Sequence, residues 1–177
     1  MLDALRRSRA LRAARAAAAE RRPHAPDPRL ESRRLFAVLP RAEEAGSDAQ
    51  REAWSFLARL PLAPGHIVPV VFGRDEGTPD AFAGAVLHVT DGDRDWRRLP
   101  SRLVAEALWS PRPDAALDLT GAFDVGAAYL VGGSPAPVRI GLDPSPEAAP
   151  FYDLMVTGGI PALHRALGRI HPPVLPV

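Results

Sequence analysis

The feature that most limits the fold is the alternation of short apolar runs with longer segments of helical pattern along residues 34–170. Strands separated by helices in this way are typical of βαβ units, in which the strands pair in parallel. The predicted strands span residues 34–39, 67–72, 85–89, 115–119, 138–142 and 152–156. The pattern predicts a three-layer, Rossmann-like α/β fold with a mainly parallel sheet of 5–6 strands.

Capping and breaking residues set the predicted helix boundaries. The predicted helices span residues 2–22, 43–60, 101–109, 124–131 and 161–170. Ser101 and Asp124 are expected as N-caps, because their side chains accept hydrogen bonds from the first helical amides. Residues 132–133 are glycines, which we expect to end a helix with glycine at C′. Pro161 fits the first position of the last helix. Pro69 lacks an N–H group, which places its strand at a sheet edge or at a bulge.

The first 33 residues differ in composition from the rest of the chain. Alanine, leucine, arginine and glutamate, all strong helix formers, continue to residue 22, and Pro23, Pro26 and Pro28 follow. A chain of 177 residues is expected to hold one domain. The sequence therefore predicts an arginine-rich helical arm with a proline-rich linker over residues 1–33, and a single α/β domain over residues 34–177.

Charge is divided unevenly between these two parts. Residues 1–34 hold ten arginines and four acids, a net charge of +6, whereas residues 35–177 hold twelve arginines and seventeen acids, a net charge of −5. A basic segment on an acidic body is typical of proteins that contact a polyanion, an anionic membrane or a protein partner. The candidate contact residues are Arg6, Arg7, Arg9, Arg12, Arg15, Arg21 and Arg22. The alternative, a helix that is merely solvated or packs on its own domain, remains open.

Several classes of site and compartment are disfavoured by residue content. The chain has no cysteine, which excludes disulfides, thiolate zinc sites and a cysteine nucleophile. No apolar run approaches the roughly 20 residues of a transmembrane helix, and the basic N-terminus is not followed by the apolar region of a secretory signal. We therefore expect a cytoplasmic protein.

Motifs for cofactors, metals and catalysis are also missing. There is no lysine for a phosphate-binding loop, and the glycines of residues 121–126 have the wrong spacing for a dinucleotide fingerprint. The histidines show no metal-ligand spacing, and Asp91, Asp93 and Asp95 do not continue as a calcium loop. No nucleophile elbow is present. The sequence thus favours a protein without metal or cofactor, and a non-enzymatic role over an enzymatic one.

Polar residues nevertheless follow several predicted strands. Open parallel sheets bind ligands beyond the carboxyl ends of their strands. The candidate ligand-binding residues there are Asp118, Thr120, Gly121, Asp124, Gly141, Asp143, Tyr152 and Asp153. For Asp124 the simplest interpretation is an N-cap, which helix-start acids commonly provide.

A series of short motifs resembles a bacterial family of unknown function, the domain of unknown function numbered 6913. The motifs are RRLFAVLP at residues 33–40, Asp-Arg-Asp-Trp at 93–96 with Pro100, Asp-Leu at 118–119, Arg-Ile-Gly at 139–141 and Tyr-Asp-Leu-Met at 152–155. The resemblance covers most of the chain and implies a basic N-terminal helix followed closely by the first strand. It implies no known activity.

Residues 118–143 are also similar to a segment in the N-terminal half of lipopolysaccharide heptosyltransferases. Asp118, Leu119 and Gly121 match its Asp-Leu-Gln-Gly turn, with Thr120 in place of glutamine, and residues 139–141 match its Arg-x-Gly strand. Those enzymes need a second Rossmann domain for the sugar nucleotide, for which 177 residues are too few. The resemblance implies a Rossmann-like fold and weighs against transfer activity.

These observations lead to one functional hypothesis with two alternatives. The first is a non-enzymatic accessory or adaptor protein whose basic helix contacts a polyanionic or protein partner, nucleic acid included. The second is a small-ligand binder or enzyme with its site at the carboxyl ends of the strands, such as a degenerate glycosyltransferase-like half domain. The third is a peripheral protein on an anionic membrane surface.

Overall fold

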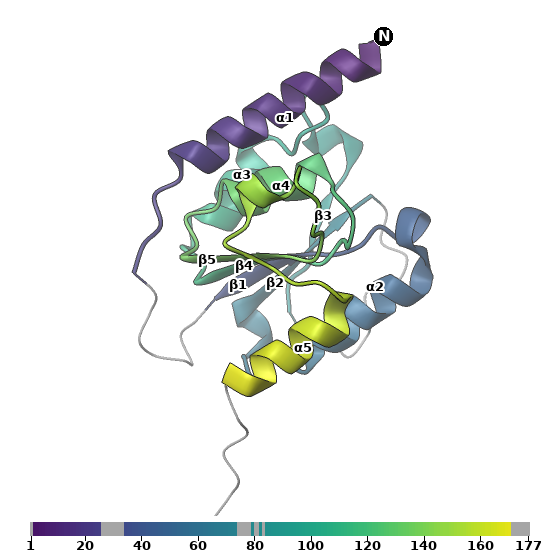
Figure 1. Ribbon diagram of the computed structural model, residues 1–177, viewed down its shortest axis with the longest axis vertical. Helices are drawn as coiled ribbons and strands as arrows, with labels where there is room; N and C mark the ends of the chain where they lie inside the picture. The colour runs from purple at the N-terminus through teal and green to yellow at the C-terminus, as the bar shows by residue number, and fades with distance from the viewer. Residues whose placement is uncertain (1, 26–33, 74–78, 80–81, 83, 171–177) are drawn as a thin grey trace, which may run out of the picture.

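The computed structural model describes residues 2–25, 34–73, 79, 82 and 84–170, so residues 26–33 of the predicted linker lie outside the described residues (Figure 1). Its sheet has six strands, all parallel. They are β1 (Leu35–Val38), β2 (Ile67–Phe72), β3 (Leu87–Val89), β4 (Ala115–Asp118), β5 (Val138–Gly141) and β6 (Leu154–Met155). The strand order is β3-β2-β1-β4-β5-β6, which confirms the predicted Rossmann-like parallel sheet.

Helices cover both faces of this sheet. They are α1 (Leu2–Glu20), α2 (Ala42–Ala58), α3 (Arg102–Trp109), α4 (Val125–Gly132) and α5 (Gly159–Ile170), with short 3₁₀ helices η2 (Pro64–His66), η3 (Asp91–Asp93) and η4 (Ala149–Phe151). In Figure 1, α3 and α4 lie on one face and α2 and α5 on the other, which gives the three predicted layers. The N-terminal helix α1 lies outside α3 and α4, against α4.

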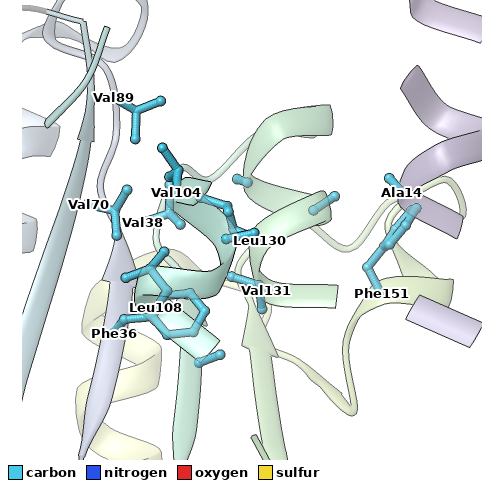
Figure 2. Packing of buried hydrophobic residues seen from close by; sticks show 14 of the residues in the cluster. Ala14, Phe36, Val38, Val70, Val89, Val104, Leu108, Leu130, Val131 and Phe151 are labelled. Atoms are coloured by element: carbon cyan, nitrogen blue, oxygen red, sulfur yellow. The ribbon is translucent and has the colours of Figure 1, made fainter. Parts of the chain in front are cut away.

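The alternation of side chains along the strands produces two cores. Phe36 and Val38 of β1 belong to the cluster beneath α3 and α4, where they meet Leu108 and Leu130 (Figure 2). The intervening Ala37 belongs to the opposite cluster, beneath α2 and α5. Successive strand residues point to opposite faces, so a strand covered on both sides is apolar at every position. This accounts for the continuous apolar runs in the sequence.

Pro69 lies in an inner strand, contrary to the predicted sheet edge or bulge. It is paired with Ala37 of β1, while pairing with β3 begins only at Val70. The Val70 carbonyl accepts from Leu39 on the β1 side, and Gly73 donates to Val89 on the β3 side. Because backbone polar groups alternate between the two sides of a strand, the missing N–H of Pro69 faces the β3 side before that pairing begins. No ladder hydrogen bond is lost there.

Two of the predicted helix starts are confirmed, and a third differs by two residues. The side chains of Ser101 and Asp124 accept from Val104 N and Ala127 N, which confirms both N-caps. The last helix begins at Gly159, so Pro161 is its third residue and not its first.

The glycines at the end of α4 serve packing, which corrects the predicted C′ role. Gly133 has φ −80°, an ordinary right-handed value, so glycine is not required there by the backbone. A Cβ on Gly132 would lie 2.8 Å from the Phe151 ring, and one on Gly133 would lie 2.8 Å from the Trp109 ring. These residues are glycines because two aromatic rings approach the backbone.

Candidate functional site

The strand order places a topological switch point between β1 and β4. The chain leaves β1 toward β2 on one side and returns to β4 on the other. Crevices of this kind, outside the carboxyl ends of the strands, are where open α/β sheets bind ligands. Here Asp118 is the last residue of β4, and Arg41 follows β1 just before α2. The structure therefore brings part of the predicted strand-end group to one place.

Asp118 is buried at this edge, with only 3% of its surface exposed. One carboxylate oxygen accepts from Thr120 N at 3.0 Å and from Thr120 Oγ1 at 2.6 Å, and the other accepts from the Tyr152 hydroxyl. Burial raises the pKa of Asp118 to about 6, because it disfavours the charged form more than the hydrogen bonds from Thr120 and Tyr152 favour it. The Asp118 carboxylate thus accepts three hydrogen bonds, two from Thr120 and one from Tyr152, and changes its charge near pH 6.

Tyr152 reaches Asp118 from the segment before β6. Its ring packs over Gly141, where an added Cβ would lie 2.6 Å from Tyr152 Cδ2. Burial raises the pKa of the Tyr152 phenol, and the negative charge of Asp118 raises it further. The proton therefore stays on the tyrosine oxygen, which donates to the carboxylate.

Replacing Gly141 by alanine should destabilise the fold by about 1–3 kcal/mol, because the new methyl group would push the Tyr152 ring away from Asp118. Gly65→Ala is the matched control, since no atom lies within 4 Å of its Cβ position and its φ is not positive. Urea denaturation of both variants measures the difference. Equal stability of the two variants would contradict the packing argument.

Asp124 holds two groups at the start of α4. One carboxylate oxygen caps Ala127 N at 2.8 Å, and the other accepts from Arg41 Nη2 at 2.9 Å. This ion pair is mostly buried, with the Arg41 and Asp124 side chains 24% and 20% exposed. Asp124 thereby joins the loop after β1 to the helix after β4, across the switch point.

Two guanidinium groups lie over the buried ring of Phe72, the last residue of β2. Arg41 and Arg94 each have their guanidinium carbon 5.2 Å from the ring centroid. Burial lowers the pKa of Arg94, and the nearby Arg41 charge lowers it further. Neither arginine was among the predicted site residues. The available signal was position, since Arg41 lies two residues after a predicted strand and Arg94 lies in the acidic loop that follows another.

The remaining strand-end residues make local turns. Asp143 accepts from the amide and hydroxyl of Ser145 at 2.9 and 2.8 Å, so the nearest bonds of this carboxylate are within its own loop. Gly121 has φ +74°, a left-handed value that favours glycine, and no described atom lies within 4 Å of its Cβ position.

Asp153 does not join the strand-end group. Its carboxylate accepts from Arg139 Nη2 at 2.8 Å and from Arg139 Nε at 3.1 Å, and it also binds Arg21 of the N-terminal segment. Asp153 precedes β6, so its backbone lies level with the beginning of β5, away from the carboxyl ends. The predicted inclusion of Asp153 in the strand-end site was therefore wrong. Although burial raises its pKa, the hydrogen bonds and charges of Arg139 and Arg21 outweigh this effect and hold the pKa low.

The predicted basic arm is docked on the domain through small residues. Ala10 and Ala14 of α1 are buried, and Ala14 points toward Phe151 beside α4 (Figure 2). Beyond the helix, Arg21 donates to the Ala136 carbonyl at 3.2 Å, and His24 N donates to the Pro135 carbonyl. The alternative in which the helix packs on its own domain therefore describes this side of α1.

The candidate arginines of the N-terminal segment divide into two groups. Arg6 pairs with Asp3 at 3.7 Å, Arg7 pairs with Glu147 at 3.7 Å, and Arg21 is largely buried against Asp153. The exposed arginines for which no described acid lies within ion-pair distance are Arg9, Arg12, Arg15 and Arg22. These four arginines form a basic exterior, because the side of α1 that carries Ala10 and Ala14 is the side that packs on the domain.

A rigid loop presents Trp96 beside α1. Asp95 accepts from the amides of Arg97 and Leu99, and the Arg97 side chain also binds Asp95. Trp96 is 60% exposed, and the guanidinium carbons of Arg9 and Arg97 lie 5.3 and 5.9 Å from its ring centroid. An exposed tryptophan on a hydrogen-bonded loop is a feature of binding surfaces.

The described residues contain neither a metal-binding cluster nor a membrane-spanning helix. No group of three or more His, Asp or Glu side chains in the described ranges could hold a metal ion. Asp93, from the acidic loop, instead accepts from Thr90 N and Thr90 Oγ1, which is a turn and cap role. None of the described helices has the length and apolarity needed to cross a bilayer.

The chain matches no family model, no curated protein and no solved structure. The resemblances to the domain of unknown function numbered 6913 and to the heptosyltransferases therefore remain predictions.

Proposed function

We propose that this chain is a non-enzymatic accessory protein that binds an anionic membrane surface through the exterior of α1 and Trp96. The observation that carries the proposal is the fixed orientation of α1. Its alanine side is buried on the domain, so Arg9 and Arg12 face outward beside an exposed tryptophan. A docked helix presents these groups without the entropic cost of ordering a free arm.

Apolar side chains on the same exterior favour a lipid partner. Leu2 and Leu5 are 72% and 50% exposed, and their spacing to Arg9 and Arg12 places all four on one stripe of the helix. Tryptophan and leucine insert at the boundary of headgroups and acyl chains, while arginines reach the headgroups. We name this surface, made of Leu2, Leu5, Arg9, Arg12, Arg15 and Trp96, the α1 surface.

Nucleic acid fits the α1 surface less well. Single strands bind proteins by stacking bases on aromatic rings, but the Trp96 ring already has the guanidinium groups of Arg9 and Arg97 over it. A base would have to displace one of them. Exposed leucines gain nothing from contact with a phosphate backbone.

The expected affinity is modest and depends on salt. Each arginine near an anionic leaflet contributes about 1 kcal/mol, and only a small apolar area is available for insertion. Binding should therefore be reversible, require anionic lipid and weaken as ionic strength rises.

The test uses charge replacement, because deleting residues 1–33 would also uncover the surface that Ala10 and Ala14 bury. A variant with Arg9, Arg12 and Arg15 changed to glutamine should lose most of the sedimentation with phosphatidylcholine vesicles that contain phosphatidylglycerol. The matched control changes Arg51, Arg59 and Arg112 to glutamine, which are exposed and lie off α1. Both variants lose the same net charge.

Three outcomes would count against the proposal. The first is an equal loss of vesicle sedimentation in the two variants. The second is a wild-type protein that does not sediment with the anionic vesicles. The third is a wild-type protein that binds vesicles without anionic lipid as well as it binds vesicles with it. Retention of the wild-type protein by a single-stranded oligonucleotide, with no binding to vesicles, would replace the membrane with nucleic acid as the partner.

A further inference from the structure

Arg94 is a buried cation without a bound acceptor in the described structure. Its side chain is 12% exposed, and its Nε is buried without a hydrogen-bond partner. The acid closest in the structure is Asp91, whose oxygen lies 3.9 Å from Arg94 Nη1, beyond hydrogen-bond distance, on a fully exposed side chain. Burying a charge that no acceptor compensates is costly. The arrangement is therefore one that an added anion would stabilise.

The position of Arg94 is fixed by its packing. The guanidinium lies over Phe72 at the end of β2, and the Phe72 ring packs against Gly126 in the first turn of α4. A side chain at Gly126 would meet this ring at 3.3 Å, so the small residue allows the close approach. Arg94 is thus held at the carboxyl edge of the sheet, beside the switch point.

A second arginine adds positive charge at the same place. Arg41 lies over the same Phe72 ring and is bound to Asp124. Asp124 binds Arg41 directly, whereas the acid beside Arg94, Asp91, lies 3.9 Å away on an exposed side chain, so Arg94 is the less compensated of the two cations. The N-terminus of α4, which Asp124 caps, adds a positive partial charge nearby.

We propose that Arg94 and Arg41 bind the phosphoryl group of a small metabolite, or free phosphate, at the carboxyl edge of the sheet, where both guanidinium groups lie over Phe72. Guanidinium groups donate paired hydrogen bonds to phosphate oxygens. A phosphate oxygen would supply the hydrogen-bond acceptor that Arg94 lacks in the described structure. Because the loop after β1 lacks the glycine spacing of the dinucleotide fingerprint, the expected ligand carries one phosphoryl group and not a dinucleotide pyrophosphate.

The experiment is a thermal unfolding series with inorganic phosphate, a nucleoside monophosphate and a sugar phosphate, each against potassium chloride of equal ionic strength. Binding to the folded state alone raises the unfolding temperature, and the rise grows with the logarithm of one plus the ratio of the ligand concentration to Kd. We expect a rise for the wild-type protein, and at least about tenfold weaker binding for Arg94→Gln. The control is Arg112→Gln, an exposed arginine outside α1 and outside the strand-end group, with the same charge change.

The three ligands separate the possible sources of the phosphoryl group. A rise with inorganic phosphate alone would identify free phosphate, and a larger rise with one ester would identify that metabolite class. Equal rises in the wild-type protein and in Arg94→Gln would overturn the proposal, as would no rise with any of the three. Arg94→Gln should itself fold normally, because it removes a buried charge that has no acceptor. Vesicle binding is measured separately, so failure of either idea leaves the other standing.

Discussion

Replacing Asp153 by alanine should lower the free energy of unfolding by about 2–3 kcal/mol, between the values for exposed and buried pairs, because Asp153 is itself 36% exposed. Asp153 is the acid bound to Arg139, whose side chain is 8% exposed, and Arg139 also donates to the Gly132 carbonyl at 2.8 Å. The alanine variant would leave the Arg139 guanidinium buried without its counter-charge. It would also release Arg21, which binds the same carboxylate and ties the end of α1 to the body.

The comparison variant is Glu106→Ala, which removes the acid of an exposed pair with Arg102 on α3. Exposed pairs of this kind contribute less than about 1 kcal/mol, so urea denaturation should give a small loss there. Adding Arg139→Met to the Asp153 variant should recover part of the stability, because it removes the uncompensated charge. A loss for Asp153→Ala no larger than that of Glu106→Ala would contradict the argument.

The effect on stability of replacing Asp118 by asparagine should be about 3 kcal/mol more favourable at neutral pH than near pH 4. The folded pKa of Asp118 is about 6, above the ordinary value of 3.8. Between these values the folded state binds more protons than the unfolded state, so the contribution of Asp118 to stability falls as pH rises from about 4 to about 6. Asparagine carries no charge and removes this dependence.

The measurement is the difference in free energy of unfolding between wild type and Asp118→Asn across this pH range. Tyr152→Phe serves as a second variant, because it keeps the ring over Gly141 but removes the hydroxyl that donates to Asp118. Loss of that donor should raise the pKa of Asp118 further and shift the transition to higher pH. A difference between wild type and Asp118→Asn that does not change with pH would show that burial leaves this carboxyl unshifted.

The strands and helices could be predicted because their signals are local. Residues 67–72 are apolar at every position, as a strand buried on both faces requires, and Ser101 and Asp124 have the chemistry of caps. Pro69 and Gly133 were misinterpreted because their reasons are not local. Pro69 is tolerated in an inner strand because β3 begins to pair with β2 only after it. Gly133 is a glycine because the Trp109 ring approaches its backbone.

The candidate site was only partly predictable for a related reason. Asp118, Thr120 and Tyr152 are joined by hydrogen bonds, and the rule that ligands bind at strand ends was enough to select them. Arg94 and Arg41 come from loops far apart in the chain and meet only over Phe72. The sequence does not specify that meeting, because it depends on the strand order. In the same way, nothing local predicts that Asp153 turns toward Arg139.

The contact between Arg9 and Trp96 links α1 to a fluorophore of the body. Trp54 is buried, and the indole N–H of Trp109 donates to the Leu130 carbonyl, so Trp96 is the tryptophan most open to solvent. One of the two cations over its ring, Arg9, belongs to the N-terminal helix, and the other is Arg97 of the same loop. Undocking of α1 would remove the Arg9 cation and change the emission and quencher accessibility of Trp96. The protein thus contains an intrinsic optical reporter of whether its N-terminal helix is seated.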